Sequence, residues 1–369
     1  MKSIVYVGMD VHKDSYTLCC YRHDYGEVFA IHKMTGEHQN ILKYLARVRE
    51  EVGYDCDFIC GYEAGSLGFS LYHQLTDKGV KCIVIAPTSI PQEKRKRIKT
   101  DKRDAIRIAE ALAFNTYKSV NMPTVEDEAV KEYIRMRCAQ KRALKKIKQQ
   151  ILAFCTRHGK KFTDGRSNWT GIHLAWLSKL DFDNDLLKET LSEQLVSYYE
   201  AVNKLALFDK RIEAIAQSER YRDDVKRLLC FLGIRTHTAL SLIVEVGDFK
   251  RFRNARHFAA YLGLVPGETS SGESIQRTGI TKAGNSHLRR LMIEAAQCYS
   301  RGALGKKSKT LLLKQAGNNP RVIAYADKAI DRMRRKFYRL SFRTKRNIIV
   351  TAIARELACF AWGMMTASF

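Results

Sequence analysis

The chain has 369 residues, and its 64 lysines and arginines outnumber its 39 aspartates and glutamates, which gives a formal net charge of +25. This length favours two or three domains over one small domain, and so large a positive charge points to a partner with a dense phosphate backbone. The basic residues are spread over several segments and not gathered on one amphipathic helix, which argues against an anionic membrane surface as the partner.

Three features favour the reduced interior of a cell. The chain reaches Asp10 without the apolar stretch of a signal peptide. The apolar segment 348–365 is interrupted by Arg355 and Glu356, which predicts a buried helix and not a membrane span. The ten cysteines include no Cys-x-x-Cys pair, so zinc is poorly supported and reduced cytoplasmic thiols fit best.

Residues 1–122 are predicted to form an α/β domain. The expected elements are strands at 5–10, 16–21 and 28–31, a helix at 41–52, a strand at 58–60, a helix at 67–78 and a strand at 81–86. A turn at 24–26 suits a hairpin, so the first three strands should be antiparallel neighbours. The later strands and the helix between them should form a βαβ unit.

Residues 123–225 are predicted to form a helical arm. Apolar side chains recur at spacings of three and four in 130–154 and again in 191–216, where Arg137 and Asp209 are exceptions. This pattern predicts an antiparallel coiled coil. The arm either mediates self-association or packs as an ordinary helical layer on its own domain.

Residues 226–369 are predicted to form a mainly helical C-terminal domain. A segment at 263–285 contains five glycines and is expected to be rich in loops. A basic helix follows it, and the block 321–346 is strongly cationic.

Four acidic residues are spaced as a metal-dependent nuclease requires. Asp10 and Glu63 end two predicted strands, and Asp101 and Asp104 lie three residues apart at a predicted helix start. Phosphoryl transfer needs hard cations beside the attacking and leaving oxygens, and carboxylates are the ligands that Mg²⁺ prefers. Their joint placement matches the elements of an RNase H-like nuclease, which would hold Mg²⁺ or Mn²⁺. The alternative for each residue alone is a structural role, in which Asp101 caps a helix and Asp104 interacts favourably with the helix dipole.

Basic residues gather beside two of these acids and again in the C-terminal part. The candidates for nucleic-acid binding are Lys94, Arg95, Lys96, Arg97, Lys99, Lys102 and Arg103, followed by Arg277, Lys282, Arg289 and Arg290. The first group would suit phosphates that approach a metal site. The last four would stabilise the charge that develops on a reacting phosphate, or else form ordinary phosphate contacts or a solvated face. His12 is taken as structural, and His287 is left open.

A serine pair offers a nucleophile. Ser270 and Ser271 precede Gly272, and a serine aimed at a phosphodiester would hold the broken strand covalently, whereas carboxylates alone would suggest hydrolysis by water. The alternative is an ordinary polar turn.

Two sets of motifs resemble one family over nearly the whole chain. The C-terminal motifs span 263–272, 279–285 and 288–290, and the acidic motifs are Gly8-Met9-Asp10, Tyr62-Glu63-Ala64 and Thr100-Asp101-Lys102-Arg103-Asp104-Ala105. They resemble the DEDD insertion-sequence transposases related to the Piv invertase.

This resemblance implies a bacterial DNA recombinase, associated with the nucleoid when active. A noncoding bridge RNA would pair with the double-stranded donor and target DNA, and two homodimers would form a tetramer in which the serine of one subunit completes the acidic site of another. The position within Pro-x-x-x-x-Ser-Gly implies that Ser271 is the nucleophile, although Ser270 stands beside it.

Two other functions remain open at this point. A RuvC-like junction endonuclease would use the same acids, with the serine segment only gripping DNA. A noncatalytic RNA- or DNA-binding scaffold would show salt-dependent binding without cleavage.

Overall fold

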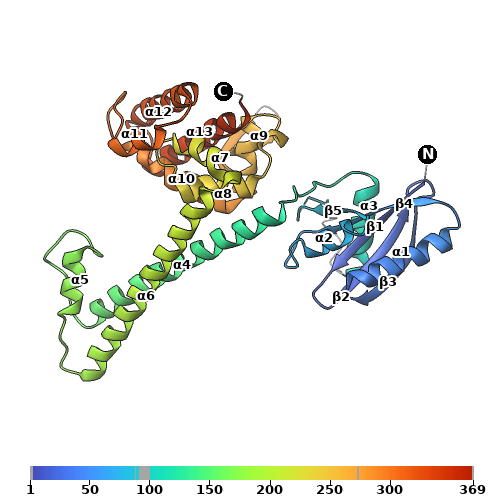
Figure 1. Ribbon diagram of the computed structural model, residues 1–369, viewed down its shortest axis with the longest axis horizontal. Coiled ribbons are helices and arrows are strands. Elements are labelled where there is room, and N and C mark those ends of the chain that lie inside the picture. Colours follow the sequence, from blue (N-terminus) through green and yellow to red (C-terminus); the bar gives the residue numbers. More distant parts are fainter. Residues whose placement is uncertain (1–2, 88, 91–99, 272–273, 368–369) are drawn as a thin grey trace. The chain divides into compact units, whose positions relative to one another are not determined.

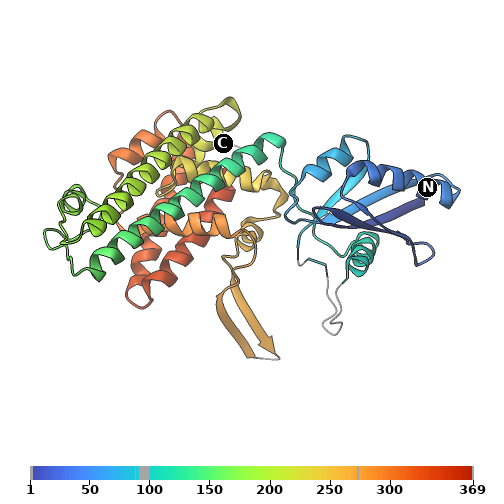
Figure 2. The same cartoon turned by 90° about the horizontal axis from the view of Figure 1, so that it is seen from below.

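The computed structural model describes residues 3–87, 89–90, 100–271 and 274–367 (Figure 1 and Figure 2). Five of the basic candidates, Lys94, Arg95, Lys96, Arg97 and Lys99, lie outside the described residues. The chain divides into two compact units, Met1–Met122 and Pro123–Phe369.

The first unit is built on a five-stranded sheet with the order β3-β2-β1-β4-β5. Its strands are β1 (Ser3–Val11), β2 (Ser15–Arg22), β3 (Glu27–Thr35), β4 (Cys56–Glu63) and β5 (Lys81–Ile85). The first three are antiparallel neighbours, whereas β4 is parallel to β1 and β5 is parallel to β4. The five predicted strands and their pairing are therefore confirmed.

Helices cover both faces of this sheet. The helices α1 (His38–Val52) and α2 (Ser70–Thr76) share one buried cluster with Val5, Val7 and Met9 of β1. The opposite face is covered by α3 (Asp101–Ala113), whose Ala105 and Ala109 pack with Cys19 and Tyr21 of β2. Because strand residues alternate between faces, Gly8 and Asp10 of β1 lie on the side of α3.

Two long helices begin the second unit. They are α4 (Val125–Arg157) and α6 (Asp185–Ala216). Tyr133 contacts Phe208 with ring centroids 5.7 Å apart, and further along α4 the Lys148 ammonium lies 5.6 Å from the ring of Tyr198. Residue numbers therefore rise on α4 as they fall on α6, so the pair is antiparallel, as Figure 1 also shows. Self-association through this pair stays a prediction.

The polar exceptions in the two apolar repeats contact each other. Arg137 on α4 donates from Nε to Oδ1 of Asp209 at 2.7 Å and from Nη2 to Oδ2 at 3.0 Å. This paired fork holds both guanidinium nitrogens and both carboxylate oxygens. The interruptions of the repeat are thus one cross-helix ion pair.

The other helices of the second unit enclose a large apolar core. They are α5 (Gly171–Ser178), α7 (Glu219–Leu229), α8 (Thr236–Val246), α9 (Ala255–Tyr261), α10 (Ser286–Ala296), α11 (Lys309–Gln315), α12 (Pro320–Ser341) and α13 (Arg346–Thr366), with single 3-10 turns at Phe249–Arg251 and Gln297–Ser300. Only α5 packs elsewhere, against a smaller cluster on α4 and α6. Among the described helices, α13 alone is long and apolar enough to cross a membrane. Its Ile353, Leu357 and Ala361 are fully buried in the core, which confirms the predicted buried helix.

The segment 263–285 differs from its prediction. Instead of loops throughout, it forms an antiparallel hairpin of β6 (Pro266–Ser271) and β7 (Ser274–Ile280), which projects from the helices of its unit in Figure 2. The glycine content favoured loops, but Gly267 and Gly279 lie inside the strands. Cross-strand pairing here overrides their weak strand propensity.

Candidate active site

Two glycines set the position of the acidic residues in the first unit. Gly8 of β1 lies beside Gly61 of β4, and a Cβ on Gly8 would stand 2.0 Å from the Ala105 carbonyl oxygen and 2.4 Å from the Ala109 nitrogen. A Cβ on Gly61 would stand 2.9 Å from both methyl groups of Leu112. The missing side chains therefore allow α3 to lie directly against β1 and β4.

Asp10 and Glu63 each follow these glycines by two residues. Both consequently lie on the face of the sheet that α3 covers. Thr100 accepts from the backbone N–H of Arg103 and so caps α3, which leaves Asp101 and Asp104 in its first turn. The alternative that Asp101 is itself the cap is wrong.

Asp10, His12 and Asp101 form one group of potential metal ligands. Their ligand atoms all lie within 4.8 Å of one another. His12 Nε2 lies 3.2 Å from Oδ2 of Asp10 and 3.8 Å from Oδ1 of Asp101. Sequence reasoning assigned His12 only a structural role, whereas the structure places its imidazole beside two of the acids. Its spacing of two residues from Asp10, directly after β1, was the signal that could have indicated this position.

Glu63 and Asp104 share a different neighbour. Arg107 Nη2 lies 3.4 Å from Oε1 of Glu63 and 3.1 Å from Oδ1 of Asp104. The four predicted carboxylates thus fall into two pairs, one beside His12 and one bridged by Arg107. No feature of the sequence around Arg107 distinguished it from the other cations of α3.

A lysine on the edge strand β3 also contacts one of the acids. Lys33 of β3 pairs with Thr17 of β2, which pairs with Asp10 of β1, so the three residues form one row across the sheet. The Lys33 ammonium lies 3.0 Å from Oδ2 of Asp101 and lowers the pKa of that carboxyl. This contact depends on strand register, which residue spacing alone did not specify.

The electrostatics of Asp10 fit a cation site. Burial raises the pKa of the Asp10 carboxyl, and the charges of Asp104 and Asp101 raise it further, while His12 opposes them. A half-buried carboxylate near two others is stabilised by a divalent cation, for which oxygen and imidazole ligands are suitable. The donor set present therefore fits such an ion.

Two of the basic candidates lie in the first turn of α3. Lys102 is exposed, and Arg103 is exposed in the first turn of the same helix. Their place beside the acids agrees with the expected approach of phosphates.

The serine pair belongs to the second unit. Ser271 is the last residue of β6 and pairs with Ser274, and Ser270 pairs with Ile275. Arg277 of β7 pairs with Glu268 in register. Only the backbone of these two serines and of Arg277 is among the described features, and their side chains lie outside them.

The base of the hairpin is held by close backbone contacts. A Cβ on Gly263 would stand 2.1 Å from the Ala283 carbonyl oxygen, and one on Gly284 would stand 2.1 Å from that of Tyr261. Arg289 Nη1 donates to the Leu262 carbonyl oxygen at 2.9 Å. Since a two-stranded hairpin is marginal alone, these contacts fix the entry and exit of the strands. Arg289 is thus used, at least in part, to hold the protein together.

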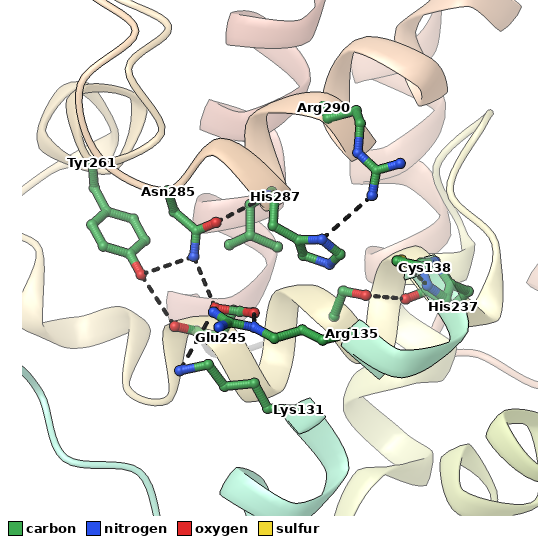
Figure 3. Close-up of polar contacts among 11 residues, drawn as sticks. Lys131, Arg135, Cys138, His237, Glu245, Tyr261, Asn285, His287 and Arg290 are labelled. Carbon is green, nitrogen blue, oxygen red and sulfur yellow. Dashed lines mark hydrogen bonds and ion pairs between the residues drawn. The ribbon is translucent and has the colours of Figure 1, made fainter. Parts of the chain in front are cut away.

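A buried carboxylate secures the helix that follows the hairpin (Figure 3). Glu245 of α8, whose side chain is 2% exposed, accepts two hydrogen bonds from Arg135 at 3.0 and 3.2 Å and one from Asn285 Nδ2 at 2.9 Å. Asn285 in turn caps α10 by accepting from the backbone N–H of Leu288 at 3.0 Å. Sequence reasoning missed this network because its members come from three distant segments.

Two of the basic candidates flank Asn285 in the sequence, Lys282 before it and Arg290 after it. Arg290 Nη2 lies 3.4 Å from Nδ1 of His287, and its Nη1 lies 3.7 Å from Glu294. Lys282 is exposed at the hairpin base and adopts a positive φ of 55°. Burial lowers the pKa of His287, which was left open by the sequence.

Comparisons with known proteins agree with this organisation. A family model for the DEDD-type domain of IS110 elements, described as "Transposase", matches residues 7–158, and the model described as "Transposase IS116/IS110/IS902 family" matches residues 225–310. The first therefore covers all four acidic residues. The second covers the hairpin with its serine pair.

Similar proteins extend the match along the chain. The transposase for insertion sequence element IS1533 of Leptospira borgpetersenii is 34% identical over 357 residues, which are 94% of this chain and 99% of that protein. The putative transposase y4qE of Sinorhizobium fredii is 36% identical over 304 residues, covering 82% and 74% of the two chains. The transposase for insertion sequence element IS1111A of Coxiella burnetii is 26% identical over 338 residues, covering 89% and 88%. The match to the DEDD-type domain begins in the first unit and continues to residue 158 on α4, and that domain implies an RNase H-like fold. The chain therefore belongs to the IS110/IS116 family of transposases.

Proposed function

We propose that this protein is an RNA-guided DNA recombinase that exchanges strands through a serine–DNA phosphodiester, with Mg²⁺ held by Asp10, Glu63, Asp101 and Asp104. Transposases cut and join DNA, and the DEDD-type domain suggests the use of a divalent metal. The observation that carries the proposal is the group of Asp10, His12 and Asp101, whose ligand atoms lie within 4.8 Å of one another. The candidate nucleophile, Ser271, lies within residues 225–310, which match the second family model.

The first chemical step follows from the residues proposed. A bound Mg²⁺ would withdraw charge from the phosphate and favour loss of the serine proton. Ser271 Oγ attacks the scissile phosphorus, a Ser–O–P bond forms, and the bond from phosphorus to one deoxyribose oxygen breaks. The proton from serine ends on that leaving oxygen as a free hydroxyl.

Strand exchange is the reverse reaction with a new partner. A deoxyribose hydroxyl of the second DNA attacks the phosphoserine and regenerates the serine, so one phosphodiester is replaced by another and no external energy is consumed. Four cations are proposed to face the phosphates in these steps: Arg277, Lys282, Arg289 and Arg290. Arg289 would do so with the guanidinium nitrogens that do not bind the Leu262 carbonyl oxygen.

Guidance by RNA and assembly into a tetramer extend the proposal. Sequence choice would come from pairing of a bridge RNA with both DNAs, and a charge of +25 supplies the attraction for three polyanions. A serine and an acidic site from different subunits would then form each reaction centre. Guidance by RNA can be tested by purifying the protein from its native host and sequencing the RNA bound to it. The proposal predicts one abundant, structured RNA species.

The two serines provide a matched test of the nucleophile. Ser271→Ala should abolish the covalent protein–DNA adduct formed with Mg²⁺, bound RNA and DNA that carries the junction of the element, whereas Ser270→Ala should keep it. Recombination by Ser271→Ala at the normal rate would overturn the assignment. Cleaved strands without any adduct in the unaltered protein would instead favour a RuvC-like endonuclease in which water attacks.

A further inference from the structure

The helix α12 has a buried face and a basic face. Its buried residues Val322, Ala326, Ala329, Ile330 and Met333 pack into the core of the second unit. Four cations follow one another at spacings of four, three and four residues, and all are exposed. They are Lys328, Arg332, Arg335 and Arg339. Side chains at such spacings share one stripe of a helix, about 16 Å long at 1.5 Å per residue.

The positive charge of this stripe is only partly neutralised. Glu356 of α13 pairs with Arg332 at 2.5 Å and with Lys336 at 2.6 Å. Lys328, Arg335 and Arg339 make no ion pair with another described residue. The three free cations therefore remain available to an anionic partner.

Two aromatic side chains stand at the C-terminal end of the same stripe. Tyr338 is 67% exposed and Phe342, which caps the helix, is 73% exposed. Their ring centroids are 5.0 Å apart and their planes are perpendicular. At 100° per residue both rings fall within about 60° of Arg335 around the helix axis. Rings and cations thus present one continuous surface, which we call the α12 face.

We propose that the α12 face binds an unpaired stretch of nucleic acid. Lys328, Arg335 and Arg339 would follow the phosphates, and Tyr338 and Phe342 would stack on bases. Charge complementarity selects a polyanion, and the rings discriminate further, because a duplex conceals the faces of its bases whereas a single strand exposes them. RNA and single-stranded DNA share this chemistry.

The face has no role in the proposed reaction. None of its residues belongs to the acidic group or to the serine hairpin. The inference uses the proposed function only for the presence of nucleic acid in the assembly, so binding through α12 is measurable without any strand transfer.

The test compares four oligonucleotide ligands and three variants of the full chain. Fluorescence anisotropy would measure the dissociation constants for labelled single-stranded RNA, single-stranded DNA of the same sequence, and the RNA and DNA duplexes. Tyr338→Ala with Phe342→Ala removes the rings, and Tyr338→Phe with Phe342→Tyr keeps them. Tyr25→Ala is the matched control, because Tyr25 is 71% exposed in the first unit.

Loss of the rings should weaken single-strand binding by about 5- to 150-fold, the range for one stacked base, and leave duplex binding unchanged. The ring-preserving variant and Tyr25→Ala should match the unaltered protein. A loss for RNA alone, DNA alone or both identifies the source of the unpaired strand, and each supports the proposal.

A second pair of substitutions tests the phosphate contacts. Arg335→Ala with Arg339→Ala should reduce the slope of log affinity against log salt by about 1.4 for single strands, since each phosphate contact contributes roughly 0.7. Unchanged single-strand affinity without the rings would overturn the proposal. An equal loss of affinity for duplexes would also overturn it. A change of oligomeric state in sedimentation would overturn it as well, because the α12 face would then be a contact between copies of the chain. Absence of a serine adduct in the unaltered protein would instead count against the proposed function alone.

Discussion

Each unit of the molecule contains carboxylates among cations, but the two groups differ in how completely they are paired. In the second unit, burial opposes ionisation of Glu245, yet bonds from Arg135 and Asn285 outweigh it and the pKa of this carboxyl lies below its usual value. In the first unit, burial and neighbouring carboxylates raise the pKa of Asp10. A buried carboxylate that is fully hydrogen-bonded, such as Glu245, stabilises the fold. A carboxylate close to other carboxylates, such as Asp10, is instead stabilised when a cation binds.

The largest contrast should appear when a crowded acid is neutralised. Asp10→Asn should lower DNA cutting by about 1,000-fold or more, because a metal ligand contributes several kcal/mol to the transition state. Its free energy of unfolding without metal should not fall, because burial and then the charges of Asp104 and Asp101 disfavour the ionised carboxyl more than His12 favours it. Activity and urea denaturation measure the two effects, with exposed Asp77→Asn as the control. Strong destabilisation would make Asp10 a structural residue.

A side chain at Gly8, where β1 packs directly against α3, should lower both the stability of the first unit and its affinity for metal. In Gly8→Ala, the new methyl group would overlap the Ala105 carbonyl oxygen and the Ala109 nitrogen, so α3 must move away from β1. We expect a loss of about 3 kcal/mol in unfolding free energy and weaker metal binding. Gly65→Ala is the control, because its nearest atom would be 3.9 Å away. Unaltered metal affinity in Gly8→Ala would show that metal binding does not depend on how closely α3 packs against β1.

The paired acid of the second unit should behave oppositely to Asp10. Glu245→Gln leaves Arg135 without its carboxylate, and we expect a loss of about 2 kcal/mol in unfolding free energy, the usual range for a hydrogen-bonded charged group. Glu294→Gln weakens two half-exposed pairs in the same unit, with Lys141 and with Arg290, and should change stability by about 0.5 kcal/mol or less. Tryptophan fluorescence during denaturation would report on this unit, because Trp169, Trp176 and Trp362 all belong to it. Equal effects of the two changes would show that the buried Glu245 contributes no more to stability than an exposed ion pair.

Acid should destabilise the second unit through a buried imidazole. Burial lowers the pKa of His237 from its ordinary value of 6.5 to about 3. Between these values the unfolded chain holds the additional proton, so stability present above pH 6.5 is lost as the pH falls towards 3, by up to about 1.4 kcal/mol per pH unit. Denaturation across this range should show a shallower slope for His237→Gln than for exposed His257→Gln. Identical slopes would show that other groups govern the acid response.

The difference between the units also explains what the sequence could predict. The positions of Asp10 and Glu63 follow from alternation along strands, and those of Asp101 and Asp104 follow from the start of a helix, so local pattern was sufficient. Lys33 reaches Asp101 through the register of three strands, and Arg135 reaches Glu245 across 110 positions of sequence. Such contacts depend on tertiary packing, which periodicity does not encode. The pairing of Arg137 with Asp209 was visible only as two faults in otherwise regular repeats.

The smallest expected effect concerns a cation that competes with the metal. The Lys33 ammonium lies 3.0 Å from Oδ2 of Asp101, so a divalent ion that takes this oxygen must displace it. Lys33→Ala should therefore tighten Mn²⁺ binding by about threefold, a modest change because the pair is exposed to solvent. Exposed Lys43→Ala alters the net charge equally and should leave the dissociation constant measured by titration calorimetry unchanged. Weaker Mn²⁺ binding in Lys33→Ala would mean that this lysine orders the carboxylate for the ion, and the first unit would then be a preformed site with its acids already held in place.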